Sequence, residues 1–321
     1  MFVNCTSMIN LLTILGCTAT GKTKLAAALA HKLESEVISA DSRQVYRGMD
    51  IGTGKDIGEY TVAGKRIPYH LIDIATPGSE YNLFSFQNDF EKAYREIHAK
   101  DRIPVLCGGT GLYLDSVLRH YELISVPEDK DLRSQLQDAT LSEITERLKK
   151  YGPLHNTTDL LDKKRAIRAL EIARFRKSFP DQIVEMPAIR SLNFGISFDR
   201  MTIRERITLR LKDRLENGLV EEVRHLLDSG LSEESLTFYG LEYRYVTLYV
   251  AGKMSFDEMF SKLNTAIHQF AKRQTTWFRR MEKKGVSIHW LDGNISLDEK
   301  LDIIFGYMKN EAPQLIQNKG S

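Results

Sequence analysis

Short apolar runs alternate with helical patterns through the first third of the chain. Residues 11–15, 36–41 and 103–107 are apolar enough to form buried strands. Residues 24–33 and 84–100, which lie between these runs, carry apolar side chains at the spacing of a helix that faces a core. This alternation predicts an α/β fold with a mostly parallel sheet flanked by helices.

The pattern changes in the middle of the chain. Residues 127–187 are helical and heavily charged, without a convincing strand, whereas residues 192–198 alternate as a strand does. We therefore expect a helical insertion domain at 125–190, carried by a catalytic core of residues 1–124 and 191–321.

The eight residues after the first apolar run form a phosphate-binding loop, or P-loop. They are Gly16, Cys17, Thr18, Ala19, Thr20, Gly21, Lys22 and Thr23. The glycines let the backbone curl so that several N–H groups face one anion, while Lys22 adds charge and the Thr23 hydroxyl can bind Mg²⁺. We expect a di- or triphosphate here. The loop alone leaves open whether that group belongs to a donor, an acceptor or a leaving group.

Two more features are expected at the carboxyl edge of the sheet, beside the P-loop. Asp41 ends the second predicted strand, and the glycine turn 108–111 follows the third. Ligands of open α/β sheets bind at this edge, so Asp41 is a candidate for catalysis or metal binding. A cap on the following turn is the simpler alternative. The glycine turn lets the backbone approach a ligand closely.

Arginine recurs every fourth residue along a helix predicted at 204–214. Arg206, Arg210 and Arg214 therefore share one face of that helix. Because few acidic side chains lie beside them, we expect this face to close over phosphates. The last segments predict a helix, a short strand at 286–290 and a further helix.

Composition narrows the class of protein. The 321 residues are 42% hydrophobic with a net charge of +2, which is ordinary for a globular protein of about two domains. The three cysteines are too widely spaced for a disulfide framework or a zinc site, and no apolar run reaches the roughly 20 residues of a membrane span. We expect a cytoplasmic monomer without a membrane segment. Local basic stretches at 163–177 and 272–284, not the overall charge, would bind polyanions.

Five motifs together resemble one family. Besides the P-loop, they are residues 41–46 with 50–53, residues 108–113, residues 165–171 and residues 272–277. In this order, over nearly the whole chain, they are similar to the tRNA dimethylallyltransferases, also called tRNA isopentenyltransferases. The resemblance implies that the phosphate is the diphosphate of dimethylallyl diphosphate. It would be released when the dimethylallyl group moves to N6 of adenosine 37, beside the tRNA anticodon.

The resemblance also implies roles for individual residues. Asp41 would act as the base, and Thr18 and Arg210 would complete the catalytic set. The P-loop, Arg206 and Mg²⁺ on Thr23 would hold the diphosphate. The anticodon stem-loop would be bound by Asp41, Ser42, Arg43, Gln44, Thr110, Arg133, Lys164, Arg165, Ala166, Ile167, Arg168, Tyr239, Gly240, Arg244, Lys272 and Arg273. Residues 239–244 depart from many relatives, which have a shorter Gly-Tyr-Arg or Gly-Tyr-Lys motif.

Three other functions compete with this interpretation. A small-molecule kinase shares a P-loop and an arginine lid, and would turn over ATP. An adenylate isopentenyltransferase shares the loop and the base but uses free AMP, ADP or ATP as its acceptor. A non-catalytic RNA-binding protein would leave the P-loop and Asp41 without a purpose. The helical insert and the basic-aromatic stretch at 272–280 favour tRNA, because a free nucleotide needs neither.

Overall fold

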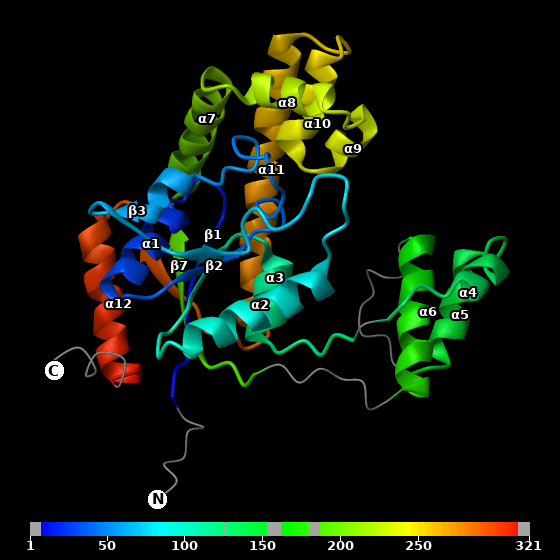
Figure 1. The fold of residues 1–321 in the computed structure, drawn as a ribbon, viewed down its shortest axis with the longest axis horizontal. Helices are drawn as coiled ribbons and strands as arrows, with labels where there is room; N and C mark the ends of the chain where they lie inside the picture. The colour runs from blue at the N-terminus through cyan, green and yellow to red at the C-terminus, as the bar shows by residue number, and fades with distance from the viewer. Residues whose placement is uncertain (1–7, 125, 153–161, 180–186, 314–321) are drawn as a thin grey trace, which may run out of the picture. The chain divides into compact units, whose positions relative to one another are not determined.

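The computed structural model describes residues 8–124, 126–152, 162–179 and 187–313. The chain forms two compact units (Figure 1). Residues 1–120 and 188–321 make up the larger unit, and residues 121–187 make up the smaller one. The bounds of the smaller unit differ by only a few residues from the bounds predicted for the insert, 125–190.

Within the described residues, the larger unit contains a six-stranded parallel sheet in the order β5-β2-β6-β1-β7-β8. The strands are β1 (Leu11–Gly16), β2 (Val37–Ala40), β5 (Tyr69–His70), β6 (Val105–Gly108), β7 (Ser191–Ser197) and β8 (His289–Asp292). A separate antiparallel pair consists of β3 (Thr61–Val62) and β4 (Lys65–Arg66). The predicted α/β fold with a mostly parallel sheet is confirmed.

The last strand is shifted from its predicted position. The alternation of apolar residues at 286–290 predicted a strand there, but β8 spans His289–Asp292. Pairing with β7 sets this register, since Phe194 lies opposite His289 and Ile196 lies opposite Leu291. Leu291 is thereby buried in the core.

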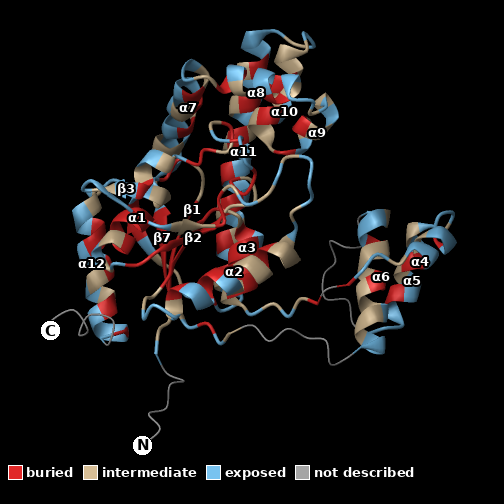
Figure 2. Cartoon of the chain, viewed as in Figure 1, coloured by how far each residue is buried: buried red, intermediate tan, exposed pale blue. Residues whose placement is uncertain are grey.

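Helices cover both faces of the sheet (Figure 1). On one face, α1 (Lys22–Lys32) and α12 (Leu297–Glu311) share a buried apolar core with the strands (Figure 2). On the other face lie α2 (Leu83–His98) and α3 (Gly111–Leu118). None of the described helices combines the length and apolar character that a membrane span requires.

A helical layer continues from β7 and has its own core. It comprises α7 (Arg200–Glu216), α8 (Leu219–Asp228), α9 (Glu233–Phe238), α10 (Leu241–Val250) and α11 (Phe256–Lys283). The short helix η1 (Ile57–Tyr60) is not part of this layer and immediately precedes β3 in the chain. Val45, Tyr46 and Met49 insert into this core from the loop after β2. The loop beside Asp41 is therefore packed against the helices and not only against the sheet.

The smaller unit is helical, with α4 (Lys130–Gln135), α5 (Leu141–Lys149) and α6 (Lys163–Ser178) among its described residues. Leu132, Ile144 and Leu170 contribute to its apolar core. The Glu171 side chain is fully buried and accepts hydrogen bonds from Arg133 and Arg168. Burial acts to raise the pKa of Glu171, but these hydrogen bonds outweigh it and hold that pKa below its usual value.

We predict that Glu171→Gln destabilises the smaller unit by about 2 kcal/mol, because it leaves two half-buried guanidinium groups without their carboxylate. Since the folded pKa lies below the unfolded one, this stabilisation is present above about pH 4 and is lost as the pH falls through the folded pKa. Hydrogen exchange of α4 to α6, compared at matched pH, measures the effect. The exposed carboxylate of Glu146 gives the control variant, Glu146→Gln; equal protection in both variants would contradict the prediction.

Candidate active site

Parallel pairing brings three strand ends to one edge of the sheet. Gly108 of β6 lies opposite Leu15 of β1 and Ala40 of β2. The P-loop, Asp41 and Gly109 each follow one of these ends. The predicted position of Asp41 beside the P-loop is thus confirmed.

A cavity of about 560 Å³ opens at this edge. It holds most of the residues that the sequence assigned to catalysis and substrate binding in the larger unit. Those that line it are Thr18, Lys22, Thr23, Asp41, Ser42, Arg43, Gln44, Thr110, Arg210, Tyr239, Gly240, Arg244 and Arg273. P-loop residues expected to bind diphosphate and residues expected to meet the acceptor base therefore share one cavity.

The P-loop has the backbone geometry of an anion cradle. Gly21 adopts φ +80° immediately before α1, and the first two residues of that helix, Lys22 and Thr23, line the cavity. The Thr20 hydroxyl donates to the Cys17 carbonyl at 2.9 Å and tightens the turn. Burial raises the pKa of the Cys17 thiol, although Lys22 acts against it, so this side chain adds no negative charge near a diphosphate.

The arginine face of α7 reaches the P-loop, and each side chain has a different contact. Arg210 donates to the Thr18 hydroxyl at 3.3 Å and also pairs with Asp56. Arg206 donates to the Ala19 carbonyl at 2.9 Å. Arg206 thus braces the loop backbone and does not line the cavity; its contact with diphosphate stays a prediction.

The third arginine, Arg214, is 9% exposed and pairs with Glu242 at 3.4 Å. Burial raises the pKa of Glu242, and the charge of Arg214 opposes that rise. Both side chains line the cavity. The acidic partners of this arginine face come from other elements, which explains why the helix sequence alone did not reveal them.

Asp41 caps a turn and also faces the cavity. Its Oδ1 accepts the Arg43 N–H at 2.9 Å. The Ser42 N–H donates to the Thr110 hydroxyl oxygen at 3.0 Å, which joins the Asp41 turn to the glycine turn. Asp41 thus caps the turn, as the simpler alternative predicted, and the same turn holds its carboxylate within the cavity. Its role in catalysis or metal binding stays a prediction.

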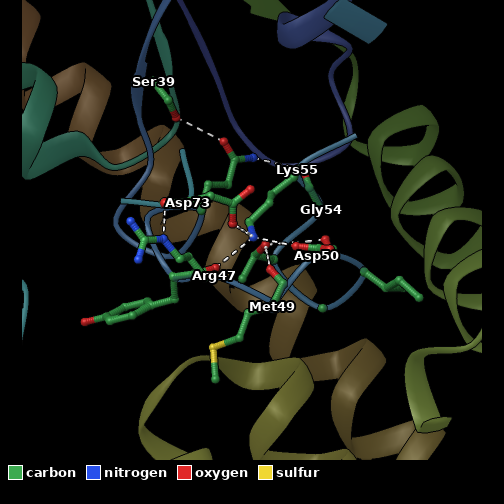
Figure 3. A network of polar contacts seen from close by, with 12 residues as sticks. Ser39, Arg47, Met49, Asp50, Gly54, Lys55 and Asp73 are labelled. Atoms are coloured by element: carbon green, nitrogen blue, oxygen red, sulfur yellow. Dashed lines mark hydrogen bonds and ion pairs between the residues drawn. The ribbon is translucent and has the colours of Figure 1, made fainter. Parts of the chain in front are cut away.

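A polar network holds the loop that follows Asp41 (Figure 3). The buried Lys55 ammonium donates to the Tyr46 carbonyl and pairs with Asp50 and Asp73. Gln44 accepts from the Ser39 hydroxyl at 3.0 Å and donates to the Gly54 carbonyl at 2.9 Å. Since both ends of the Gln44 amide are engaged, its side chain shapes the cavity wall, and its contact with RNA stays a prediction.

Glu222, at the start of α8, secures the same loop and was not singled out from the sequence. Its carboxylate accepts the backbone N–H groups of Asp50, Ile51 and Gly52 at 2.7–3.0 Å. It also accepts the Tyr243 hydroxyl at 2.7 Å. Burial, together with Glu222, raises the pKa of Tyr243 well above its usual value.

Two residues of α11 complete the site and were quoted in a motif without a role. The Gln274 amide contacts both the P-loop and the glycine turn, accepting from Thr18 and donating to Gly109. Trp277 packs against Gly111, where a Cβ would lie 2.4 Å from the indole. A signal for Gln274 existed, because it is the polar member of the buried stripe Met259, Leu263, Ile267, Ala271, Gln274, Phe278 and Met281.

The remaining residues assigned to tRNA differ in what they offer. Tyr239 is 4% exposed, packs edge-on against Tyr46, and accepts a hydrogen bond from the Gly78 N–H at its hydroxyl oxygen. Lys272 is exposed and is not among the residues that line the cavity. In the smaller unit, Lys164 and Arg165 are exposed.

One assigned residue of the smaller unit needs correction. Ala166 is fully buried, so its methyl group packs in the core and is not available to RNA. Ile167 packs against the same core. Arg133 and Arg168 already pair with Glu171. Any RNA contact of Arg133, Ile167 and Arg168 stays a prediction.

The fold and the site define a class of protein: a P-loop α/β enzyme whose cavity joins an anion cradle to an acidic side chain. The IPP transferase family model matches residues 44–281, and the isopentenyl transferase model matches residues 9–71. The chain belongs to the IPP transferase family.

Similar proteins cover nearly the whole chain. A tRNA dimethylallyltransferase 2 of Bacteroides fragilis is 56% identical over 295 residues, which are 92% of this chain and 96% of the relative. A tRNA dimethylallyltransferase 1 of Parabacteroides distasonis is 50% identical over 94% of this chain and 98% of the relative. The structure of a full-length tRNA isopentenylpyrophosphate transferase from Bacillus halodurans aligns with a TM-score of 0.69 and 30% identity, covering 97% and 99% of the two chains.

We predict that Glu222→Gln destabilises the larger unit by about 2 kcal/mol, because an amide has one acceptor oxygen and would turn its NH₂ group toward backbone donors. Hydrogen exchange of residues 50–54 and urea unfolding measure the effect. Glu221→Gln removes an adjacent, exposed carboxylate of the same helix and serves as the control. Similar exchange in the two variants would show that the Glu222 contacts do not hold the loop.

Proposed function

We propose that this protein transfers the dimethylallyl group of dimethylallyl diphosphate to N6 of adenosine 37 in tRNA and releases diphosphate. One observation carries the proposal: Asp41 shares a cavity with Lys22 and Thr23 of the P-loop. A donor diphosphate and an acceptor base can therefore meet there. The family and the relatives named tRNA dimethylallyltransferase support the same reaction.

In this mechanism, the N6 amine attacks the first carbon of the dimethylallyl group. The carbon–oxygen bond breaks, and its electron pair leaves with the diphosphate. The N6 proton passes to the Asp41 carboxylate, which the turn at Arg43 holds in place. Because the bond to the leaving group stretches in the transition state, stabilisation of the diphosphate lowers the barrier directly.

The P-loop and Arg210 supply that stabilisation. Backbone N–H groups at the start of α1 and the Lys22 ammonium face the anion, and Arg210 approaches from α7 through Thr18. The Thr18 hydroxyl, which accepts from Arg210, can donate its own proton to a diphosphate oxygen. The P-loop, the start of α1 and helix α7 thus each contribute groups that stabilise the leaving diphosphate.

Mg²⁺ fits this site as a companion of the diphosphate. Among the described residues, no group of three or more His, Cys, Asp or Glu side chains could hold a metal by itself. Mg²⁺ usually keeps several waters and binds few protein oxygens together with phosphate oxygens, so the Thr23 hydroxyl is sufficient as the protein ligand. The ion would neutralise charge that builds on the diphosphate.

The acceptor is assigned to tRNA and not to a free nucleotide. Exposed Phe238 and Phe270 line the cavity, with Arg43 and Arg273 lying over their rings at 5.8 and 5.9 Å. Aromatic and arginine surfaces of this kind stack unpaired bases. The smaller unit adds exposed basic residues for the RNA backbone, which AMP would not require.

We predict that protein with Mg²⁺ and labelled dimethylallyl diphosphate labels an anticodon stem-loop that carries adenosine 37, and does not label AMP. A stem-loop with guanosine at position 37 is the control and should remain unlabelled. Label in AMP would assign the protein to the adenylate isopentenyltransferases. Label in neither acceptor, with turnover of ATP, would assign it to a kinase.

We predict that Asp41→Asn lowers kcat by about 10²–10⁴-fold, because the amide can still accept the Arg43 N–H but cannot take a proton. Binding of pyrophosphate should be unchanged or slightly tighter. Asp292 makes a similar turn contact with the Asn294 N–H, outside the set of cavity residues, so Asp292→Asn is the control. Wild-type turnover in Asp41→Asn would remove Asp41 from the role of base.

A further inference from the structure

The two halves of the proposed site are joined by one side chain. Gln274 comes from the buried stripe of α11 and is 7% exposed. Its Oε1 accepts the Thr18 N–H at 2.9 Å, and its Nε2 donates to the Gly109 carbonyl at 2.8 Å. Both polar atoms are therefore engaged, one with the P-loop and one with the glycine turn.

Each contact of Gln274 continues to a residue expected in catalysis. On the donor side, the Thr18 hydroxyl accepts from Arg210. On the acceptor side, Gly109 precedes Thr110, whose hydroxyl accepts the Ser42 N–H beside Asp41. The Gln274 amide thus connects the diphosphate cradle to the Asp41 turn through a short series of hydrogen bonds.

The atoms around the Gln274 amide leave little room for a different packing of this side chain against Gly109. A Cβ at Gly109 would lie 2.6 Å from the Gln274 nitrogen and 3.5 Å from Cε of Lys22. The close approach of backbone, amide and ammonium therefore requires glycine at this position. An amide is also the group of this size that donates and accepts at once in fixed geometry, whereas an ionised carboxylate only accepts.

From these contacts we propose that Gln274 is a positioning residue that sets the separation between the P-loop and the Asp41 turn, and so the alignment of the leaving group with the acceptor amine. The proposal rests on the proposed function of the same cavity. Its chemical consequence is specific: Gln274 acts on the transfer step and not on the capture of RNA, so its loss lowers kcat and leaves KM for the stem-loop unchanged.

The test compares Gln274→Glu and Gln274→Met with wild type across a range of pH. Each kcat is divided by the wild-type value at the same pH, which removes the titration of Asp41. Gln274→Met loses both hydrogen bonds without adding charge, and we expect about a tenfold to hundredfold lower kcat at every pH. Gln274→Glu should be similarly impaired when ionised. It should recover as the pH falls, because a protonated carboxyl can donate to Gly109 and accept from Thr18.

Two measurements keep this test separate from the test of the proposed function. Calorimetric titration with magnesium pyrophosphate needs no turnover, and we expect weaker binding in both variants, with recovery at low pH only in Gln274→Glu. Gln269 is exposed on the same helix, so Gln269→Glu is the matched control for the added charge. Thermal midpoints of all variants report on folding.

The outcomes decide the role of Gln274. Wild-type kcat and wild-type pyrophosphate binding in Gln274→Met would overturn the proposal, because only the charge of Gln274→Glu would then matter. A pH-independent loss in Gln274→Glu would overturn it as well. If the wild-type protein labels neither the stem-loop nor AMP, the proposed function fails. The pyrophosphate titration still tests whether Gln274 positions the P-loop.

Discussion

Pairing of β6 with both β1 and β2 is the constraint on which the site depends. All three strands run the same way, so their carboxyl ends meet at one edge, and the segments that leave them are the P-loop, the Asp41 turn and the glycine turn. The P-loop could bind an anion on many scaffolds. Only the order of strands places an acidic side chain and a close backbone turn beside it.

The sheet edge does not hold these segments by itself. The loop after Asp41 leaves the sheet and is fixed by two charged side chains that do not line the cavity. The half-buried Glu222 carboxylate accepts three of its backbone N–H groups, and the buried Lys55 ammonium donates to its Tyr46 carbonyl. Helices α7, α10 and α11 line the cavity on the helical side, while α8 supports the loop through Glu222. The helical layer of this chain thus shapes the cavity through contacts made outside its lining.

The sequence was sufficient for features that depend on neighbours along the chain. The P-loop, Asp41 and the first strands were predictable because strand, turn and helix signals follow one another within a few residues. The contacts of Glu222 and Gln274 were not predictable, because their partners lie far away along the chain. The apolar stripe marks Gln274 as a buried polar residue but does not say which loop it meets. The last strand was misplaced for the same reason: local alternation suggested residues 286–290, but pairing with β7 decided the register.

If the cavity binds diphosphate as proposed, the ion pair between Arg210 and Asp56 has a consequence for that binding. Before any anion enters, Arg210 already faces a carboxylate, so binding exchanges one anion for another instead of creating a new charge pair. Arg210 is already held at the P-loop by its contacts with Thr18 and Asp56, so fixing its side chain costs little further conformational entropy. A weakly charged anion gains nothing from such an exchange, whereas a diphosphate, with more charge and more acceptor oxygens, does. In the proposed function, the pair would therefore select for diphosphate by its charge.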